Sequence, residues 1–150
     1  MKRFLKRNWW FLLSMAAILF IGLVCQPIRI TGSSMEPNFT DGMIRITKSA
    51  RDIRRGDVVV LRLPGCPRYI KRIIGLPGEE VVISRGSIYI NGKLLAEEYT
   101  TKPLKENETY CTKLGEDEYF VLGDNRPEST DSRVFGPVEQ SCIIRCVSEK

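Results

Sequence analysis

The sequence predicts a mainly β protein: one apolar N-terminal helix followed by an all-β domain of the sandwich or barrel type. Three observations support this fold class. Residues 9–25 form an unbroken apolar run, the rest of the chain has no sustained helical period, and Gly and Pro separate many short runs rich in β-branched residues. A chain of 150 residues has room for one domain with a real core and little more.

Residues 9–25 are expected to cross a membrane as a helix. These 17 residues carry no charge, and a helix of that length measures roughly 26 Å, close to the hydrocarbon thickness of about 30 Å. Trp9 and Trp10 stand where aromatic rings prefer the membrane interface, and Pro27 cannot continue the helix. A cleaved signal peptide and a buried core helix are the alternatives. An uncleaved anchor fits better, because Val24 is too large to precede a lipoprotein-type cut and no Ala-x-Ala pattern follows.

The charge distribution orients this segment and argues against a nucleic-acid partner. The net charge is +5, but four basic residues lie in the first eight positions, and beyond them 19 basic residues stand against 18 acidic ones. The positive-inside rule makes residues 1–8 a cytoplasmic tail, residues 9–25 a single-pass anchor in the cell membrane, and residues 26–150 an extracytoplasmic domain. Because the basic excess lies in the tail, nucleic-acid binding is not expected.

The extracytoplasmic region is interpreted as a series of short strands. Alternation or β-branched content predicts strands at residues 43–47, 57–63, 68–74, 81–83, 87–90, 93–95, 118–122 and 142–147. Asn91-Gly92 is the strongest hairpin signal in the chain and joins two of these strands. Residues 100–108 are polar and predict an exposed loop, and residues 123–137 form a long turn-rich stretch.

The absence of histidine limits the possible chemistry. It excludes Ser-His-Asp and Cys-His catalysis and any metal site that needs imidazole. A lysine is then the candidate base for a serine. Lys71 lies next to Arg72 with apolar residues on both sides, so one of these two cations is expected to point into the fold. Burial lowers the pKa of a lysine, and a lysine base requires that shift.

Two loops carry further candidate residues. Gly-Ser-Ser-Met-Glu-Pro at residues 32–37 predicts a rigid turn that aims Ser34, although such a stretch alone is usually an ordinary loop. Gly-Asp-Asn-Arg at residues 123–126 precedes a run of hydroxyl and charged side chains. That stretch is either an ordinary charged turn or a device that orients a base, since a carboxylate–guanidinium pair can hold a loop in one geometry.

Four cysteines lie beyond the anchor, in a compartment that permits disulfides. Cys142 and Cys146 on one strand would be about 13 Å apart and could not bond to each other. Either each of them pairs with Cys66 or Cys111, or Cys66 and Cys111 pair and leave two buried thiols. No metal-ligand spacing occurs, so neither a metal nor another cofactor is expected.

Four motifs in order give the chain a family resemblance. They are residues 32–37, Arg-Gly-Asp-Val-Val-Val at 55–60, Tyr-Ile-Lys-Arg-Ile-Ile-Gly-Leu-Pro-Gly at 69–78, and the stretch 123–136. With these motifs after an N-terminal anchor, the chain resembles the bacterial type I signal peptidases (leader peptidases), a family of serine–lysine proteases. The short region between residues 76 and 119 leaves no room for a large accessory subdomain, so the chain looks like a minimal, Gram-positive-like form.

The resemblance implies roles for individual residues. Ser34 would be the nucleophile and Lys71 the general base. Ser129 would supply a hydroxyl group that forms a hydrogen bond with that lysine, and Asp131 and Arg133 would form a supporting ion pair. Shallow pockets for small side chains would be lined by Ile30, Met35, Phe39, Tyr69 and Ile70. The oxyanion hole would use the backbone N–H of the nucleophile, but many members add a hydroxyl two residues earlier, where this chain has Gly32.

The implied function is that of a monomeric, membrane-bound serine endopeptidase without a cofactor. It would cleave N-terminal signal peptides from exported preproteins after small residues of the Ala-x-Ala type, and its partners would be those preproteins and the lipid bilayer. A self-cleaving serine–lysine protease of the SOS-repressor kind is the second interpretation. The anchor and the lack of a helical DNA-binding domain argue against it. A catalytically inactive β-domain that only binds exported peptides is the third, and the presence of both dyad residues disfavours it.

Overall fold

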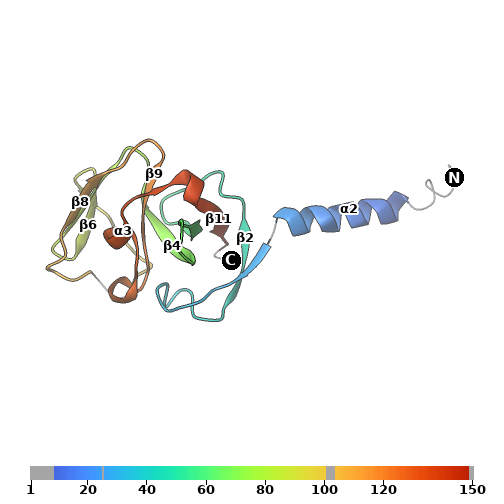
Figure 1. Cartoon of the computed structure of the whole chain (residues 1–150), viewed down its shortest axis with the longest axis horizontal. Helices are drawn as coiled ribbons and strands as arrows, with labels where there is room; N and C mark the ends of the chain where they lie inside the picture. Colours follow the sequence, from blue (N-terminus) through green and yellow to red (C-terminus); the bar gives the residue numbers. More distant parts are fainter. Residues whose placement is uncertain (1–8, 25, 101–103, 149–150) are drawn as a thin grey trace.

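The structure is a computed structural model that describes residues 9–24, 26–100 and 104–148. One helix, α2 (Trp9–Val24), projects from a body built of two antiparallel sheets (Figure 1). The predicted mainly β class is therefore confirmed. Among the described residues, none of the helices is long and apolar enough to cross a membrane. The last position of the predicted anchor, Cys25, lies outside the described residues.

The larger sheet has seven strands and the smaller has four. In spatial order, the larger sheet contains β1 (Gln26–Arg29), β2 (Ile44–Lys48), β11 (Ile143–Val147), β3 (Val58–Arg62), β4 (Arg68–Gly75), β9 (Glu118–Leu122) and β10 (Val138–Glu139). The smaller sheet contains β7 (Lys93–Leu94), β6 (Ser87–Ile90), β5 (Glu80–Ser84) and β8 (Tyr110–Lys113). Short helical turns complete the described chain: η1 (Arg126–Glu128), α3 (Ser132–Phe135) and η2 (Gln140–Cys142).

The predicted strands agree with the observed ones to within one residue at each end. Asn91 and Gly92 have φ of 50° and 76°, the left-handed values that a two-residue hairpin requires, and they join β6 to β7 as predicted. Three short strands were not predicted, namely β1, β8 and β10. β1 contains Pro27, which an edge strand tolerates, and β10 is only two residues long.

The predicted exposed loop over residues 100–108 needs one correction. Residues 105–107 are exposed, but Leu104 is 4% exposed and belongs to the core beneath the smaller sheet. A polar stretch can hide one anchoring apolar residue, because the surrounding side chains dominate its composition. Residues 101–103 lie outside the described part of the chain.

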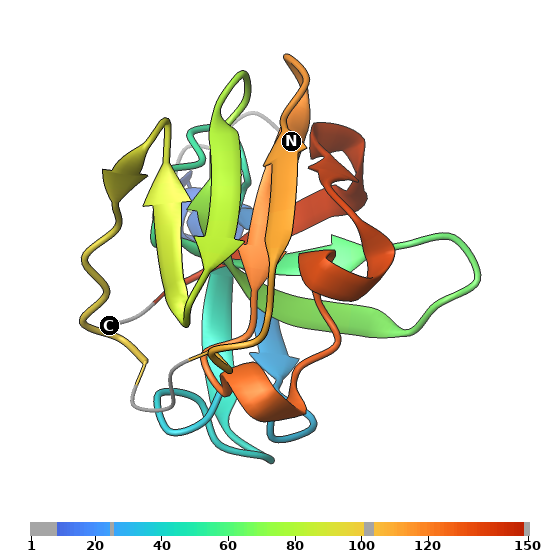
Figure 2. The ribbon, with the colours of Figure 1, turned by 90° about the vertical axis from the view of Figure 1, so that its left-hand side faces the viewer.

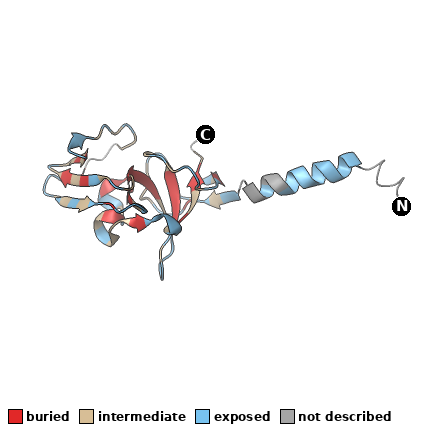
Figure 3. Ribbon diagram, turned by 90° about the horizontal axis from the view of Figure 1, so that it is seen from above, coloured by how far each residue is buried: buried red, intermediate tan, exposed pale blue. Residues whose placement is uncertain are grey.

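Strand β4 belongs to the larger sheet and leads from the surface into the core that the two sheets share. Its burial increases from exposed Arg68 to buried Gly75. Figure 3 shows that the buried residues lie in the β-domain, whereas the described part of α2 is exposed. At the far end of β4, side chains of the smaller sheet pack against β4 and β9: Val81 and Ile83 share one apolar cluster with Ile74 and Phe120. A Cβ on Gly75 would lie 2.7 Å from Val81 and 2.9 Å from Phe120, so only glycine permits this close approach. The near end of β4 stays open to solvent.

Candidate active site

Ser34 lies in the loop that follows β1, and that loop is closed by its own hydrogen bonds. The Ile30 N–H donates to the Met43 carbonyl at 2.8 Å, and the Gly32 N–H donates to the Asp41 carboxylate at 2.9 Å. Gly32 has a φ of 89°, a left-handed conformation that glycine adopts without strain. The buried side chain of Met35 anchors the loop in the apolar core, which leaves the neighbouring Ser34 half-buried at its surface.

Asn125 holds the Ser34 loop from the opposite side. Its backbone N–H donates to the Ser34 carbonyl at 3.0 Å, and its side-chain amide donates to the Ser33 carbonyl at 3.1 Å. These two bonds join the turn-rich stretch 123–137 to the loop at residues 32–37. Two motifs that are about 90 positions apart in sequence therefore meet at one place.

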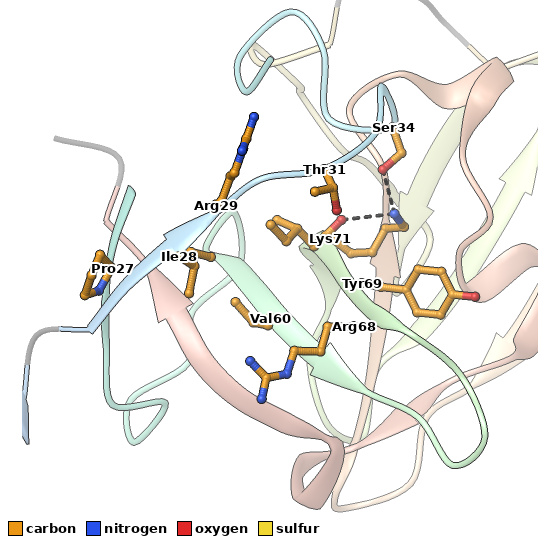
Figure 4. A pocket seen from close by; sticks show the side chains of 10 residues that line it. Pro27, Ile28, Arg29, Thr31, Ser34, Val60, Arg68, Tyr69 and Lys71 are labelled. Carbon is orange, nitrogen blue, oxygen red and sulfur yellow. Dashed lines mark hydrogen bonds between the residues drawn. The ribbon is translucent and has the colours of Figure 1, made fainter. Parts of the chain in front are cut away.

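Lys71 of β4 reaches the Ser34 hydroxyl. Its Nζ lies 2.8 Å from Ser34 Oγ and 3.0 Å from the Ile70 carbonyl (Figure 4). The residue is only 2% exposed, and its Nζ lies 5.5 Å from the centre of the Tyr69 ring. Burial lowers the pKa of Lys71 from 10.5 to about 8, although the charges of Asp131 and Asp124 act in the opposite direction. A lysine in this environment can lose its proton near neutral pH.

Arg72 is also buried, which differs from the expectation that one of the two cations points into the fold. Lys71 is 2% exposed and Arg72 is 4% exposed. The guanidinium of Arg72 forms a bidentate ion pair with Asp124, at 2.8 Å and 2.7 Å, and lies 4.3 Å from the centre of the Tyr99 ring. The bidentate pair compensates the burial of this charge. No ion pair of that kind holds Lys71 among the described residues.

Asp131 and Arg133 form an ion pair beside the dyad. Arg133 donates from Nε and from a terminal nitrogen to the two oxygens of Asp131, at 2.8 Å and 2.9 Å. Asp131 also accepts the Gly123 N–H at 3.0 Å, and Arg133 donates to the Arg126 carbonyl at 2.7 Å. The pair therefore joins the beginning of the turn-rich stretch to its end and fixes the backbone that carries Asn125.

Ser129 is close to the dyad but does not make the expected hydrogen bond with Lys71. Its Oγ is buried and has no hydrogen-bond partner among the described residues. The side chain instead packs against the backbone of Gly123. If Gly123 carried a Cβ, that atom would lie 2.5 Å from Ser129 Cβ and 2.5 Å from the Ser34 carbonyl oxygen. Within the described part of the chain, Lys71 Nζ donates hydrogen bonds to Ser34 and Ile70 only.

A pocket of about 320 Å³ opens beside the two residues, between β1 and the exposed beginning of β4. Ser34 and Lys71 line one end of it, together with Tyr69 and Ile70 (Figure 4). Ile30, Met35 and Phe39 do not line this pocket. They are buried in the core cluster beneath it, with exposures of 1%, 1% and 3%. Of the five side chains expected to contact substrate, the structure therefore places two at the pocket and three in its support.

The four cysteines beyond residue 25 are free thiols in this structure. Cys66 and Cys111 are exposed, whereas Cys146 is buried in β11 and Cys142 ends the turn before that strand. Neither of the two pairing schemes is present. The described residues also contain no cluster of His, Cys, Asp or Glu suited to a metal ion.

Sequence reasoning missed the residues that hold the site from outside the motifs. Glu97 pairs with Arg126, which is 1% exposed, and Arg126 Nε donates to the Gly123 carbonyl at 3.1 Å. Tyr99 covers Arg72, and Glu108 pairs with Arg133 at 2.9 Å. These three contacts come from the polar connection between β7 and β8. The composition of this connection does not indicate which distant residues Glu97, Tyr99 and Glu108 would contact.

Comparison with known proteins identifies what this chain is similar to. The family model described as "Signal peptidase, peptidase S26" matches residues 1–148. The chain is 40% identical over 143 residues to a probable signal peptidase I-2 of Synechocystis sp., covering 86% of this chain and 65% of that protein. It is 31% identical over 167 residues to signal peptidase I V of Bacillus subtilis, covering 97% of this chain and 99% of that protein. A crystal structure of a signal peptidase I from Enterococcus faecalis superposes with a TM-score of 0.58 at 34% identity, covering 67% of this chain and 100% of the other.

Proposed function

The chain belongs to the signal peptidase family and is a signal peptidase I; from this premise we propose that Ser34 and Lys71 are its catalytic dyad. The observation that carries the proposal is the contact of 2.8 Å between Lys71 Nζ and Ser34 Oγ at the end of an open pocket. The chain has no histidine, so another side chain must act as the base. Lys71 is suited to this role because its pKa is lowered to about 8.

The reaction proceeds in two acyl-transfer steps. Neutral Lys71 accepts the Ser34 proton while Ser34 Oγ attacks the carbonyl carbon of the scissile bond. The resulting tetrahedral oxyanion collapses, the C–N bond breaks, and Lys71 returns the proton to the leaving amine. A water molecule then loses a proton to Lys71 and attacks the acyl carbon on Ser34. The second tetrahedral intermediate collapses, the bond between the acyl carbon and Ser34 Oγ breaks, and Lys71 returns the proton to Ser34 Oγ. The signal-peptide carboxyl group is released and ionises in water. The enzyme recovers its starting protonation state.

The backbone N–H of Ser34 is proposed as a donor to the oxyanion. Among the described residues it donates to no other group, so it remains available for a substrate oxygen. Gly32 supplies no hydroxyl, so any second donor comes from elsewhere. Asn125 contributes indirectly, because its two hydrogen bonds to the loop fix the direction of the Ser34 backbone.

Substrate is proposed to bind as an added strand in the pocket beside Ser34. In the described part of the chain β1 is an edge strand, and β4 pairs with β9 only from Arg72 onward, so both borders of the pocket can offer backbone groups to a substrate. Main-chain hydrogen bonds to such edges provide affinity, and small pockets provide selectivity. The half-buried Tyr69 and Ile70 narrow the pocket near Ser34, which suits the small side chains of an Ala-x-Ala sequence.

Residues 1–25 are proposed to be a cytoplasmic tail and a membrane anchor, with residues 26–150 as the extracytoplasmic peptidase domain. The support comes from the part of α2 whose side chains are described, in which the large apolar side chains between Trp9 and Leu19 are 45% to 80% exposed. A helix that is apolar on all sides requires an apolar environment. The four basic residues that precede it favour the cytoplasmic side for the N-terminus.

The test is cleavage of a preprotein whose signal peptide ends in Ala-x-Ala, with full-length protein in a nonionic detergent. Mass spectrometry should locate a single cut after that sequence, and Ser34→Ala should abolish it. Failure of the parental protein to cut any preprotein would favour an inactive peptide-binding domain. Cleavage that persists in Ser34→Ala would show that another residue is the nucleophile. Cleavage only within the chain itself would favour the self-cleaving class.

A further inference from the structure

Two arginines border the pocket beside the dyad and have no ion-pair partner among the described residues. Arg29 comes from β1 and Arg68 from the beginning of β4, and both line the pocket that contains Ser34 (Figure 4). Both side chains are exposed, and neither makes a hydrogen bond or an ion pair with any described residue. No acidic side chain lines the pocket among the described residues. The positive charge there is therefore not neutralised by this part of the chain.

The proposed function determines which part of a substrate would meet these charges. β1 runs toward Ser34 and β4 runs toward Lys71, so both strands approach the dyad from their N-terminal ends. The proposed function places the small residues of an Ala-x-Ala sequence, which precede the scissile bond, in this pocket beside Tyr69 and Ile70, so the residues before the cut would lie along β1 and the beginning of β4. Arg68 precedes Lys71 by three positions, roughly 10 Å at about 3.3 Å per residue. The charges therefore lie beside the last few residues of the signal peptide.

From this arrangement we infer that Arg29 and Arg68 select substrates by charge: they favour acidic over basic side chains in the few residues before the cut. The inference rests on the proposed function and adds a specificity determinant to it. The first and third residues before the cut must be small to fit beside Tyr69 and Ile70, so selection applies mainly to the second and fourth. A lysine at those positions would be repelled by the positive charge of the two arginines, and an aspartate would be attracted by it.

The effect should be moderate and sensitive to salt, because both guanidinium groups are exposed to solvent. At low ionic strength we expect kcat/KM for an aspartate substrate to exceed that for the lysine substrate about tenfold. In about 1 M salt, at which the Debye length is about 3 Å, that ratio should approach one.

The experiment compares two preproteins that differ only by Asp or Lys at the second and fourth residues before the cut. Full-length protein in a nonionic detergent excludes any contribution from lipid charge. The variants are Arg29→Gln, Arg68→Gln and the double variant. The control is Arg51→Gln, which removes an exposed guanidinium that does not line the pocket and changes the net charge by the same amount. The readout is the Asp-to-Lys ratio of kcat/KM, so a general loss of activity cancels.

The inference is supported if the Asp-to-Lys ratio falls in each single variant and approaches one in the double variant. The ratio should stay at its parental value in Arg51→Gln. A parental ratio near one would overturn it, as would a ratio that the double variant retains. A ratio that Arg51→Gln lowers as much as Arg68→Gln would also overturn it, because the selection would then come from overall charge. Each of these outcomes leaves the proposed function intact as long as Ser34→Ala is inactive. Absence of any cleavage by the parental protein would overturn both.

Discussion

The adjacent cations Lys71 and Arg72 show how residue type determines the use of a buried position. Both side chains are nearly inaccessible to solvent, yet only Arg72 has a bidentate carboxylate partner. An arginine stays charged and needs that partner, whereas a lysine can release its proton when burial penalises its charge. Lys71 is therefore suited to transfer protons and Arg72 to hold Asp124 in place.

Gly123 is the residue at which one added methyl group should be most harmful to the site. A Cβ there would lie 2.5 Å from the Ser34 carbonyl oxygen and 2.5 Å from Ser129 Cβ. Because these atoms cannot overlap, Gly123→Ala must displace the loop that carries the nucleophile. We expect kcat/KM for a preprotein to fall about 100-fold, the cost typical of a displacement near 1 Å.

The matched control is Gly115→Ala, in which the nearest atoms are the carboxylate and stem of Glu118 at 3.4 Å or more. That variant should keep the parental rate. Near-parental cleavage by Gly123→Ala would mean that the close packing of Ser34, Gly123 and Ser129 is not needed for catalysis.

At the scale of elements, the connection between β7 and β8 contacts the turn-rich stretch 123–137 and β4 (Figure 2). It brings Glu97 to Arg126, Tyr99 to Arg72 and Glu108 to Arg133. Each contact joins the region of the smaller sheet to a residue of β4 or of the stretch 123–137. The smaller sheet therefore contributes to the site through this connection as well as through the shared core.

Removal of the Glu97 carboxylate should destabilise the β-domain. Arg126 is 1% exposed and would keep its charge without the ion-pair partner. Breaking a buried pair in this way typically costs about 3–5 kcal/mol of unfolding free energy. Glu97→Ala should lose an amount of that order in urea denaturation followed by far-UV circular dichroism. Tryptophan fluorescence would be uninformative, because both tryptophans are in α2.

Glu98→Ala is the control for this measurement. Its side chain is exposed and makes no hydrogen bond with a described residue, so its effect should stay within about 0.5 kcal/mol. Equal stability of the two variants would contradict a structural role for the Glu97–Arg126 pair.

The sequence allowed the longer elements to be predicted because their signals are local. Hydrophobic runs predicted most strands, and Asn91-Gly92 predicted the β6–β7 hairpin. β1 and β10 are short edge strands whose pairing depends on distant partners, so no local pattern revealed them. Ser34 and Lys71 were identified through the order of the family motifs, and histidine-free composition narrowed the choice of base. The pairing of Glu97 with Arg126 depends on how separate segments pack, and no single stretch of sequence encodes that.

At the scale of the whole molecule, the position of α2 next to β1 links the proposed anchor to the active site. β1 begins at Gln26, and the Ser34 loop follows it directly. Ile44 and Ile46 of the neighbouring β2 are 65% and 55% exposed. The β-domain therefore exposes apolar side chains on β2, the strand that pairs with β1.

Removal of residues 1–25 should leave a folded but aggregation-prone β-domain with reduced activity. Every described strand begins at or after Gln26, so circular dichroism should still report β structure. Size-exclusion chromatography should show association, and cleavage should increase when detergent or lipid is added. Full activity of the truncated protein with no dependence on either would contradict the proposed arrangement at a membrane.

The most direct test of the dyad is the pH dependence of preprotein cleavage for the parental protein beside Lys71→Arg. Burial lowers the pKa of Lys71 to about 8, so the side chain is protonated below that pH and cannot accept the Ser34 proton. The parental rate should rise through about pH 8 and level off above it, far below the 10.5 of an ordinary lysine. Arginine keeps the charge but stays protonated, so Lys71→Arg should be as inactive as Lys71→Ala at every pH. Near-parental cleavage by Lys71→Arg at pH 8 would contradict the assignment of Lys71 as the base.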